Sequence, residues 1–228
     1  MEQSVVILDY IRLQFSLFEM RLNALAEYVA LQIATKGFVV LDDLLEQSNV
    51  LALKDRFLVL KNEDEFEKAG IGKQIHYTIN ANVRGDFIRW IDEKDTLSVT
   101  FPLFQIIQAF IVQLNRMCYL GIKDLESHYA FYPPGKGYEM HRDRFKNNQH
   151  RMISFVLYLN DGWKPADGGE LVLYDESKKI IKQVEPMENR LVVFLSEILH
   201  EVLPCNKERK SITGWLLDAP KELTFIAH

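Results

Sequence analysis

Apolar residues recur with a helical period along the first part of the chain. Leucine, alanine and valine follow this spacing from residue 17 to 36 and again from about 44 to 62, with charged residues between them. Gly37 predicts the end of the first helix, because glycine readily adopts the left-handed conformation that follows a helix. The next segment, FVVLDD, predicts a short buried strand.

An uncharged run from Leu97 to Asn115 is long enough to raise the question of a membrane span. Pro102 interrupts this run and is placed to open a helix, and Gly121 is placed to close it. Glutamines within the run recur at near-helical spacing. We therefore expect a buried amphipathic helix and no membrane contact.

The pattern changes near Leu125 to short strands separated by turns. The expected strands are ESHYAFYP, YEMHRD, RMISFVLYLN, GELVLYD, LVVFLS, HEVLP and RKSITGWLL, with glycine-, proline- and asparagine-rich turns between them. Regularly spaced short strands are typical of a jelly roll or barrel. We expect an α+β fold in which residues 1–124 form a helical support region with short strands and residues 125–228 form the all-β core, the two making one compact unit.

Composition narrows the classes of function. The 228 residues are 48% hydrophobic and 26% charged, as in ordinary globular proteins. A net charge of −5 argues against binding to nucleic acid or to an anionic membrane. The two cysteines form no CxxC motif, and Asp9 and Arg12 interrupt the apolar N-terminus, which does not resemble a signal peptide. These features favour a cytoplasmic protein.

The stretch GYEMHRDRF, residues 137–145, carries the first candidate chemistry. In a strand, side chains at i and i+2 leave the same face, so His141 and Asp143 point the same way. They could form a hydrogen-bonded pair, a catalytic dyad or two thirds of a metal site. His200, in FLSEILHEVLP at the end of an apolar strand, would complete a 2-His-1-carboxylate triad, which leaves three positions open on Fe(II). The alternative for His200 is a histidine at the core edge that is hydrogen-bonded to a backbone carbonyl.

The run RKSITGWLL supplies a candidate anion site. Strand alternation places Arg209, Thr213 and Trp215 on one face and Lys210 on the other. A buried arginine beside a metal needs an anionic partner, and guanidinium binds carboxylate through two parallel N–H groups. A dicarboxylate that chelates the metal and reaches Arg209 would satisfy both groups. In the alternative, Arg209 closes a turn in solvent.

Five segments follow one another in a specific order and spacing over roughly residues 125 to 218: FYPPGKGYEMHRDRF, ISFVLYLN, DGGELVLY, RLVVFLSEILHEVLP and RKSITGW. This series resembles the iron(II)- and 2-oxoglutarate-dependent dioxygenases, specifically the prolyl 4-hydroxylase-like branch with its bacterial single-chain members. The resemblance implies a double-stranded β-helix, which is a jelly roll whose mouth holds the iron. A weaker likeness extends upstream to RGDFIRW, for which it suggests a lid or pocket wall.

The resemblance also implies roles for individual residues. His141, Asp143 and His200 would bind Fe(II), and Arg209 would bind the C5 carboxylate of 2-oxoglutarate. Lys210 is the competing candidate, but strand parity favours Arg209. Tyr132, Tyr158 and Leu171 would line the cosubstrate pocket, with simple core packing as an equal alternative, and Thr213 shares the strand face of Arg209.

The implied activity is hydroxylation of a protein residue with Fe(II), 2-oxoglutarate and O2, and with ascorbate as a further candidate cofactor. The resemblance favours prolyl 4-hydroxylation of a cytoplasmic protein, with the translation machinery as the first candidate source of the substrate. The alternatives are a free amino acid or another small molecule as substrate, oxidative demethylation of nucleic acid, which the acidic composition disfavours, and a metal-binding sensor without turnover. The sequence does not indicate an oligomeric state.

Three further residues have less specific interpretations. His76 and His128 stand at the starts of expected strands and are interpreted as structural histidines with satisfied hydrogen bonds. Trp163, in the loop NDGWKPADGG, either packs over the mouth of the site or anchors the loop.

Overall fold

The computed structural model describes residues 2–70, 83–92, 99–144 and 149–220, with side chains from residue 16 onward. Two antiparallel sheets face each other in its C-terminal part. In chain order, the elements before the core are α1 (Glu2–Lys36), β1 (Phe38–Leu41), α2 (Gln47–Asn62), β2 (Glu67–Lys68), β3 (Phe87–Trp90) and α4 (Phe101–Cys118). They are followed by β4 (Asp124–Tyr132), β5 (Tyr138–His141), β6 (Arg151–Tyr158), the 3₁₀ turn η2 (Pro165–Asp167), β7 (Leu171–Tyr174), β8 (Ile180–Val184), β9 (Leu191–Leu195), β10 (Leu199–Val202) and β11 (Arg209–Leu217).

The strands form the double-stranded β-helix of a jelly roll. The larger sheet has the order β1-β9-β6-β11-β4-β3-β2, and the smaller sheet has the order β5-β10-β7-β8. Every named strand pair is antiparallel. Because β1, β2 and β3 come from the first 124 residues and join the larger sheet, the division of the chain at residue 124 stays a prediction.

Alternation along β6 shows how the larger sheet separates two cores. Phe155 and Leu157 belong to the cluster that packs against the helices, whereas Val156 and Tyr158 belong to a second cluster on the opposite face. Both sets of side chains are buried, which explains the nearly continuous apolar run in this strand. The second cluster lies between the two sheets, and the candidate site is built around it.

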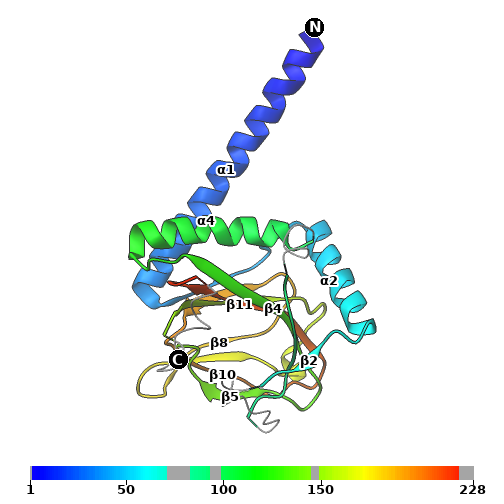
Figure 1. Cartoon of the computed structure of the whole chain (residues 1–228), viewed down its shortest axis with the longest axis vertical. Helices are drawn as coiled ribbons and strands as arrows, with labels where there is room; N and C mark the ends of the chain where they lie inside the picture. The colour runs from blue at the N-terminus through cyan, green and yellow to red at the C-terminus, as the bar shows by residue number, and fades with distance from the viewer. Residues whose placement is uncertain (1, 71–82, 93–98, 145–148, 221–228) are drawn as a thin grey trace.

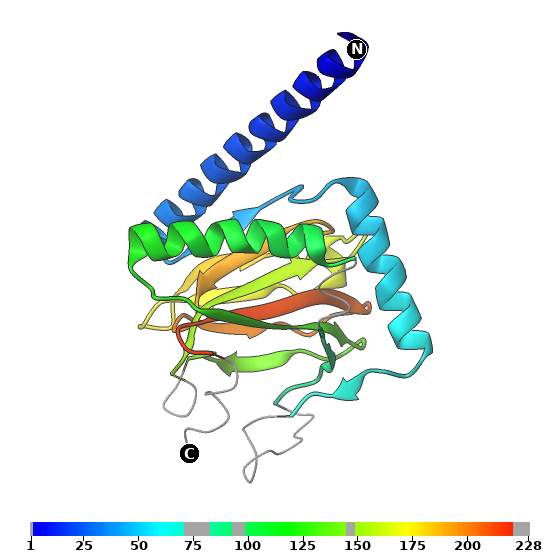
Figure 2. The same ribbon diagram turned by 45° about the horizontal axis from the view of Figure 1, so that its top comes forward.

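The helices cover the outer face of the larger sheet (Figure 1). Small residues of α1, Ala26 and Ala30, are fully buried in the first cluster together with Phe110 and Leu114 of α4. Small side chains allow the two helices to approach closely. The N-terminal part of α1 extends well beyond the body of the molecule in both orientations (Figures 1 and 2). No helix within the described residues has both the length and the apolar character needed to cross a membrane.

The predicted helix boundaries agree with the structure only in part, since α4 begins beside Pro102 as expected but ends at Cys118, before Gly121. The first helix ends at Lys36, and Gly37 follows in the left-handed region with φ +78°. The same helix begins at Glu2 rather than near residue 17. Apolar residues occupy consecutive positions in its first turns, so the helical period does not show there. Strand β8 was not predicted, because four of its five residues are exposed and its apolar residues do not alternate.

Candidate metal centre and cosubstrate pocket

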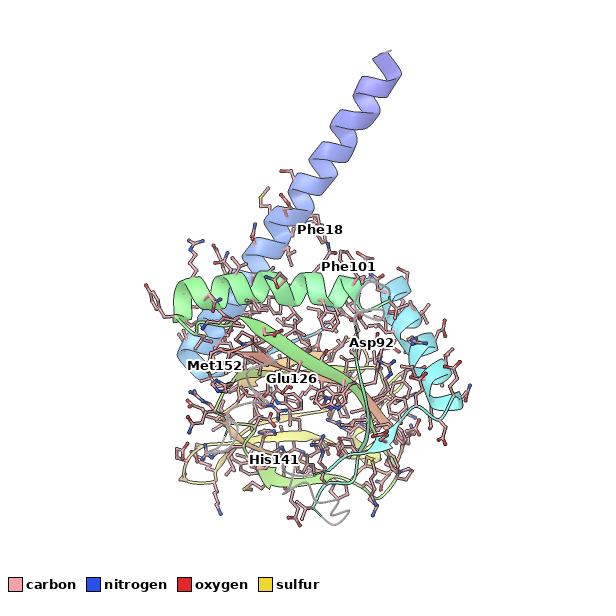
Figure 3. The ribbon with its side chains drawn as sticks, in the orientation of Figure 1. Phe18, Asp92, Phe101, Glu126, His141 and Met152 are labelled. Atoms are coloured by element: carbon pink, nitrogen blue, oxygen red, sulfur yellow. The ribbon has the colours of Figure 1, made fainter. Side chains whose placement is uncertain are left out.

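Two histidines and one aspartate converge where β5 and β10 pair. His141 and His200 lie directly opposite each other in the antiparallel ladder, with ring centroids 4.2 Å apart. Asp143 follows β5. Its Oδ1 lies 3.7 Å from His141 Nε2, and its Oδ2 lies 3.5 Å from His200 Nε2. One ligand atom from each residue lies within 4.8 Å of the others, close enough to share one metal ion. Figure 3 shows His141 on the side of the molecule away from the helices.

The position of His200 differs in one respect from the prediction. The apolar strand β9 ends at Leu195, and a turn over residues 196–198 separates it from β10, on which His200 is the second residue. The turn redirects the chain from the larger sheet to the smaller one. His200 therefore reaches His141 through a strand pairing that its own sequence segment does not reveal.

Backbone hydrogen bonds orient both imidazoles toward the carboxylate. His141 Nδ1 lies 2.7 Å from the Glu139 carbonyl oxygen, and His200 Nδ1 lies 2.8 Å from the Ile198 carbonyl oxygen. A carbonyl oxygen only accepts, so each Nδ1 donates its proton and each Nε2 carries a lone pair. This is the arrangement of a metal-binding imidazole, and the backbone contact proposed as an alternative for His200 is here compatible with ligation.

The electrostatics of the cluster suit a cation. Burial and the neighbouring His200 lower the pKa of His141 to about 3, so this imidazole is neutral near neutral pH. Burial alone would raise the pKa of Asp143, but His200, His141 and Arg151, together with a hydrogen bond from Ser154, hold that pKa well below its usual range. The cluster therefore offers an ionised carboxylate next to an unprotonated imidazole nitrogen.

An aromatic ring and an arginine support His141 on its open side. The Tyr138 ring stacks on the His141 ring, with centroids 3.6 Å apart and planes 19° apart. The Arg84 guanidinium lies 5.0 Å from the Tyr138 ring centroid and forms a two-pronged pair with the buried Asp86, at 2.7 and 3.0 Å. Sequence reasoning did not identify these supports; Tyr138 lies in the motif GYEMHRDRF, and Arg84 and Asp86 lie in the motif RGDFIRW.

The RGDFIRW segment lies beside the site. Gly85 N donates to the Gly137 oxygen next to β5, and the oxygen of Val83, just before the segment, accepts from Glu139 N. The second part of the segment is β3, which pairs with β4 in the larger sheet. The segment therefore links the two sheets beside the metal cluster, and its role as a lid or pocket wall stays a prediction.

Arg209 lies at the start of β11, inside the protein. Its side chain is only 2% exposed, its Nε donates to the Gly169 carbonyl oxygen at 2.8 Å, and its Nη2 donates to the Tyr158 hydroxyl at 3.3 Å. The guanidinium carbon also lies about equally far from two aromatic rings, 5.2 Å from that of Tyr132 and 4.9 Å from that of Tyr158. Among the described residues, no carboxylate pairs with this guanidinium. A buried cation without a carboxylate partner is a receptor for an anionic ligand.

The remaining residues of the expected cosubstrate pocket lie around the second core. Leu171 belongs to the same buried cluster as Tyr132 and Tyr158, from the facing sheet. Thr213 lies two residues beyond Ser211, whose hydroxyl is 3.4 Å from that of Thr213. Lys210 faces the other side of β11, opposite Phe131 of the helix-side core. The geometry favours Arg209 over Lys210, and the roles of these residues stay predictions.

Trp163 agrees with one of its two interpretations from the sequence, whereas His128 does not fully agree with its own. Trp163 is buried and donates to the Gly168 carbonyl oxygen at 2.9 Å, so it anchors its loop. His128 is buried, but its Nδ1 has no hydrogen-bond partner among the described residues, so the expectation of a satisfied structural histidine is wrong for this nitrogen. His76 lies outside the described residues.

Known proteins share both the sequence pattern and the fold. The profile of the 2OG-Fe(II) oxygenase superfamily matches residues 127–217. A crystal structure of a prolyl-4-hydroxylase from Pseudomonas putida superposes with a TM-score of 0.75 at 36% identity, covering 84% of this chain and 98% of that one. The chain belongs to the 2OG-Fe(II) oxygenase superfamily.

Two further relatives of this 2OG-Fe(II) oxygenase are similar in fold or in sequence. A Trichoplax adhaerens prolyl hydroxylase, solved in complex with a peptide fragment of the hypoxia inducible factor oxygen degradation domain, superposes with a TM-score of 0.78 at 28% identity, covering 91% of this chain and 94% of that one. Human Egl nine homolog 1 is 30% identical over 203 residues, which are 85% of this chain and 46% of that protein. The chain thus spans about half the length of the human relative.

The site of this 2OG-Fe(II) oxygenase fits the groups in the family description. Two imidazoles with Nε2 available and one ionised carboxylate are the donor set of the facial triad. Arg209 is a buried cation, and its role as the partner of a 2-oxoglutarate carboxylate stays a prediction.

Proposed function

We propose that the chain is an Fe(II)- and 2-oxoglutarate-dependent dioxygenase that hydroxylates a prolyl residue in a protein. The observation that carries the proposal is the combination of two features. One is the cluster of His141, Asp143 and His200. The other is Arg209, whose buried guanidinium has no carboxylate partner among the described residues. The names of two relatives, the prolyl hydroxylases of Pseudomonas putida and Trichoplax adhaerens, support the prolyl target.

The chain's own residues bind and position the reactants. Fe(II), when bound with 2-oxoglutarate and O2, supplies oxidative hydroxylation: one oxygen atom enters a substrate C–H bond, and the other converts 2-oxoglutarate to succinate and carbon dioxide. His141, Asp143 and His200 would hold the metal and leave three positions open. Arg209 would fix the distal carboxylate of 2-oxoglutarate, and Tyr158, which accepts from Arg209, keeps the guanidinium oriented. Burial of these groups excludes competing water.

A row of aromatic side chains supports a protein substrate over a small one. Arg151, Trp215, His128 and Trp90 come from β6, β11, β4 and β3, which are adjacent strands of the larger sheet. The Arg151 guanidinium lies 3.5 Å from the Trp215 ring centroid, the Trp215 and His128 centroids are 5.3 Å apart, and the His128 and Trp90 centroids are 5.1 Å apart. Trp90 is 49% exposed at the end of the row, whereas Trp215 and His128 are buried. Extended proline-containing segments bind to exposed aromatic side chains, so Trp90 is the contact that the row offers to such a segment.

The row begins next to the metal cluster. Ser154, which lies opposite Trp215 in the sheet, donates a hydrogen bond to Asp143. An extended segment that contacts Trp90 would lie at the exposed end of a row whose buried end borders the metal cluster. We propose a cytoplasmic protein as the source of that segment, with a translation-machinery protein as the first candidate, and ascorbate stays a candidate reductant.

The experiment that tests the proposed function uses whole-proteome mass spectrometry. Cells with and without the intact chain are compared for prolyl residues whose mass has increased by one oxygen atom, and the corresponding peptide is then incubated with the purified protein, Fe(II) and 2-oxoglutarate. The proposal predicts that succinate forms in proportion to hydroxyproline. Succinate release stimulated only by a free amino acid or another small molecule would contradict the prolyl protein substrate. Failure to consume 2-oxoglutarate with any substrate would contradict the enzyme.

A further inference from the structure

Two buried serine hydroxyls lie behind the candidate metal ligand Asp143. Ser154 Oγ lies 2.6 Å from Asp143 Oδ2, and Ser196 Oγ lies 2.9 Å from Ser154 Oγ. Ser154 is 1% exposed and Ser196 is fully buried. We call Ser154 and Ser196 the serine pair. It contacts the carboxylate through only one of its two oxygens.

The direction of this hydrogen-bond chain follows from the number of protons available. An ionised carboxylate only accepts, so Ser154 donates its single hydroxyl proton to Asp143. The hydrogen bond between the two serines must then be donated by Ser196. The chain runs from Ser196 to Ser154 to Asp143, and each hydroxyl in it has one defined orientation.

The serine pair also connects the two segments that carry the candidate ligands. Ser154 belongs to β6, in the middle of the larger sheet. Ser196 opens the turn that leads to His200; its N–H donates to the Met152 carbonyl oxygen at 3.1 Å, and its carbonyl oxygen accepts from Arg144 N at 2.9 Å. The turn before His200 and the residue after Asp143 are therefore attached to each other and to β6.

Arg142 adds a third connection at the same place. Its guanidinium donates to the Glu197 carbonyl oxygen in that turn, and it pairs with both oxygens of the Glu176 carboxylate, at 3.1 and 2.9 Å. The residues on both sides of Asp143 thus bind the turn through side chain or backbone. The carboxylate torsion of Asp143 remains to be fixed, and among the described residues the Ser154 hydroxyl donates a hydrogen bond to this carboxylate.

We propose that Ser154, supported by Ser196, is a positioning residue that makes Asp143 bind the metal through a single oxygen. Carboxylate torsions are broad, and a carboxylate can bind a metal through one or two oxygens. The hydrogen bond from Ser154 engages Oδ2 and leaves Oδ1 as the ligand. A second bound oxygen would occupy one of the three positions that 2-oxoglutarate and O2 need. This inference rests on the metal site of the proposed function.

The test compares metal binding in variants of the full chain. Co(II) is titrated into apoprotein without 2-oxoglutarate, and both the dissociation constant and the visible absorption spectrum, which reports coordination, are recorded. Ser154→Ala removes the hydroxyl, Ser154→Thr retains it, and Ser196→Ala removes only the supporting hydrogen bond. Ser177→Ala is the matched control, because Ser177 Oγ donates to Asp175 at 2.7 Å on the exposed turn between β7 and β8.

The expected results form a graded series. Ser154→Ala should weaken Co(II) binding by about 10- to 100-fold, the usual effect of removing a hydrogen bond to a metal ligand, and should change the visible spectrum. Ser196→Ala should give a smaller loss in the same direction. Ser154→Thr should remain close to the unmodified protein, and Ser177→Ala should match it. Circular dichroism in the presence of a chelator checks that each variant is folded.

Three outcomes would overturn the inference. Unchanged Co(II) affinity and spectrum in Ser154→Ala would show that the hydroxyl does not position the carboxylate. Equal losses in Ser154→Ala and Ser154→Thr would assign the effect to packing. If Ser154→Ala does not fold, Ser196→Ala alone decides the outcome. An unchanged Co(II) affinity and spectrum in Ser196→Ala would then overturn the supporting role of Ser196. A separate result, the absence of metal binding by the unmodified chain, would contradict the proposed function itself. The failure of the inference and the failure of the proposed function can therefore be distinguished.

Discussion

At the scale of single residues, Arg209 is the group whose environment is hardest to explain without a ligand. It is almost fully buried, yet among the described residues it hydrogen-bonds only to a carbonyl oxygen and a phenol, both of them neutral. A charge held in the interior by neutral partners alone is costly. A carboxylate ligand would offset that cost. Substitution of Arg209 therefore tests whether the cosubstrate is a carboxylate such as 2-oxoglutarate.

Replacing Arg209 with leucine should therefore weaken the use of 2-oxoglutarate. Losing one partner of a buried charge pair costs about 3–5 kcal/mol, which corresponds to roughly a 10²- to 10⁴-fold rise in the 2-oxoglutarate KM. Steady-state succinate formation at varied 2-oxoglutarate measures this rise. Lys210→Leu is the control, because Lys210 lies on the other face of the strand. A strong effect of Lys210→Leu with none from Arg209→Leu would reverse the assignment.

The metal ligands give a second prediction at this scale. His141→Ala or Asp143→Ala should abolish succinate formation, because removing one of three ligands disrupts both the affinity and the geometry of the site. Metal content after dialysis and succinate release are measured together. His150→Ala, at a histidine that pairs with Asp218 away from the cluster, should retain both. Metal retention and full activity in Asp143→Ala would contradict the triad.

The sequence was informative at the residue scale where the chemistry is local. His141 and Asp143 follow from strand parity, and Arg209 follows from the alternation along β11. His200 was proposed as the third member of a 2-His-1-carboxylate triad, but its own segment does not reveal the pairing of β5 with β10 that brings these distant parts of the chain together. The serine pair has no sequence signal of its own, since isolated serines in apolar strands are common. Only the folded structure places those hydroxyls behind the carboxylate.

At the scale of elements, strands with two buried faces were predictable and exposed ones were not. β6 and β11 contain long apolar runs because the helix core contacts one face and the intersheet core the other. β8 lies at the edge of the smaller sheet, where exposed lysine and glutamine carry no burial signal. β3 was interpreted as part of a lid or wall, and its pairing with β4 depends on the tertiary fold.

Gly37 connects the element scale to the site. Gly37 follows the last residue of α1 and has a φ of +78°. Its carbonyl oxygen accepts a hydrogen bond from Leu195 N, next to the turn that precedes His200. A Cβ at this position would lie 3.0 Å from Ile198 Cδ1. Gly37→Ala should cost about 1–2 kcal/mol from backbone strain alone, and more from this contact. For a chain of this size the melting temperature should fall by about 2–4 °C per kcal/mol.

Gly121→Ala is the matched control for the contact at Gly37. Gly121 also has a positive φ, +64°, but nothing lies within 4 Å of an added Cβ. It should therefore show the strain without the contact. Calorimetry of the two variants tests the difference, and a Gly37→Ala variant no less stable than Gly121→Ala would show that the contact contributes nothing.

At the scale of the whole molecule, the helices stabilise one face of the larger sheet while the other face carries the chemistry (Figure 1). This division lets the aromatic row reach solvent at Trp90 without exposing the helix core. A protein substrate would contact the exposed Trp90, whereas 2-oxoglutarate would bind only inside the protein, at Arg209. The two binding events should therefore respond to different substitutions.

Trp90→Ala should separate these two events. The loss of an exposed aromatic anchor should raise the KM for a protein substrate by about tenfold or more, while the 2-oxoglutarate KM stays the same. Peptide hydroxylation measured by mass spectrometry reports the first quantity and succinate release the second. Tyr119→Ala removes an aromatic side chain that is 88% exposed after α4 and should change neither. Equal effects of the two variants would argue against binding on the aromatic row.

The most direct measurement is a crystal structure of the protein grown without oxygen in the presence of Fe(II) and 2-oxoglutarate, with the ion located by anomalous scattering. We predict one ion bound by His141 Nε2, His200 Nε2 and a single oxygen of Asp143, and a 2-oxoglutarate molecule whose distal carboxylate binds the Arg209 guanidinium. An ion bound elsewhere, or a 2-oxoglutarate that does not reach Arg209, would contradict the account.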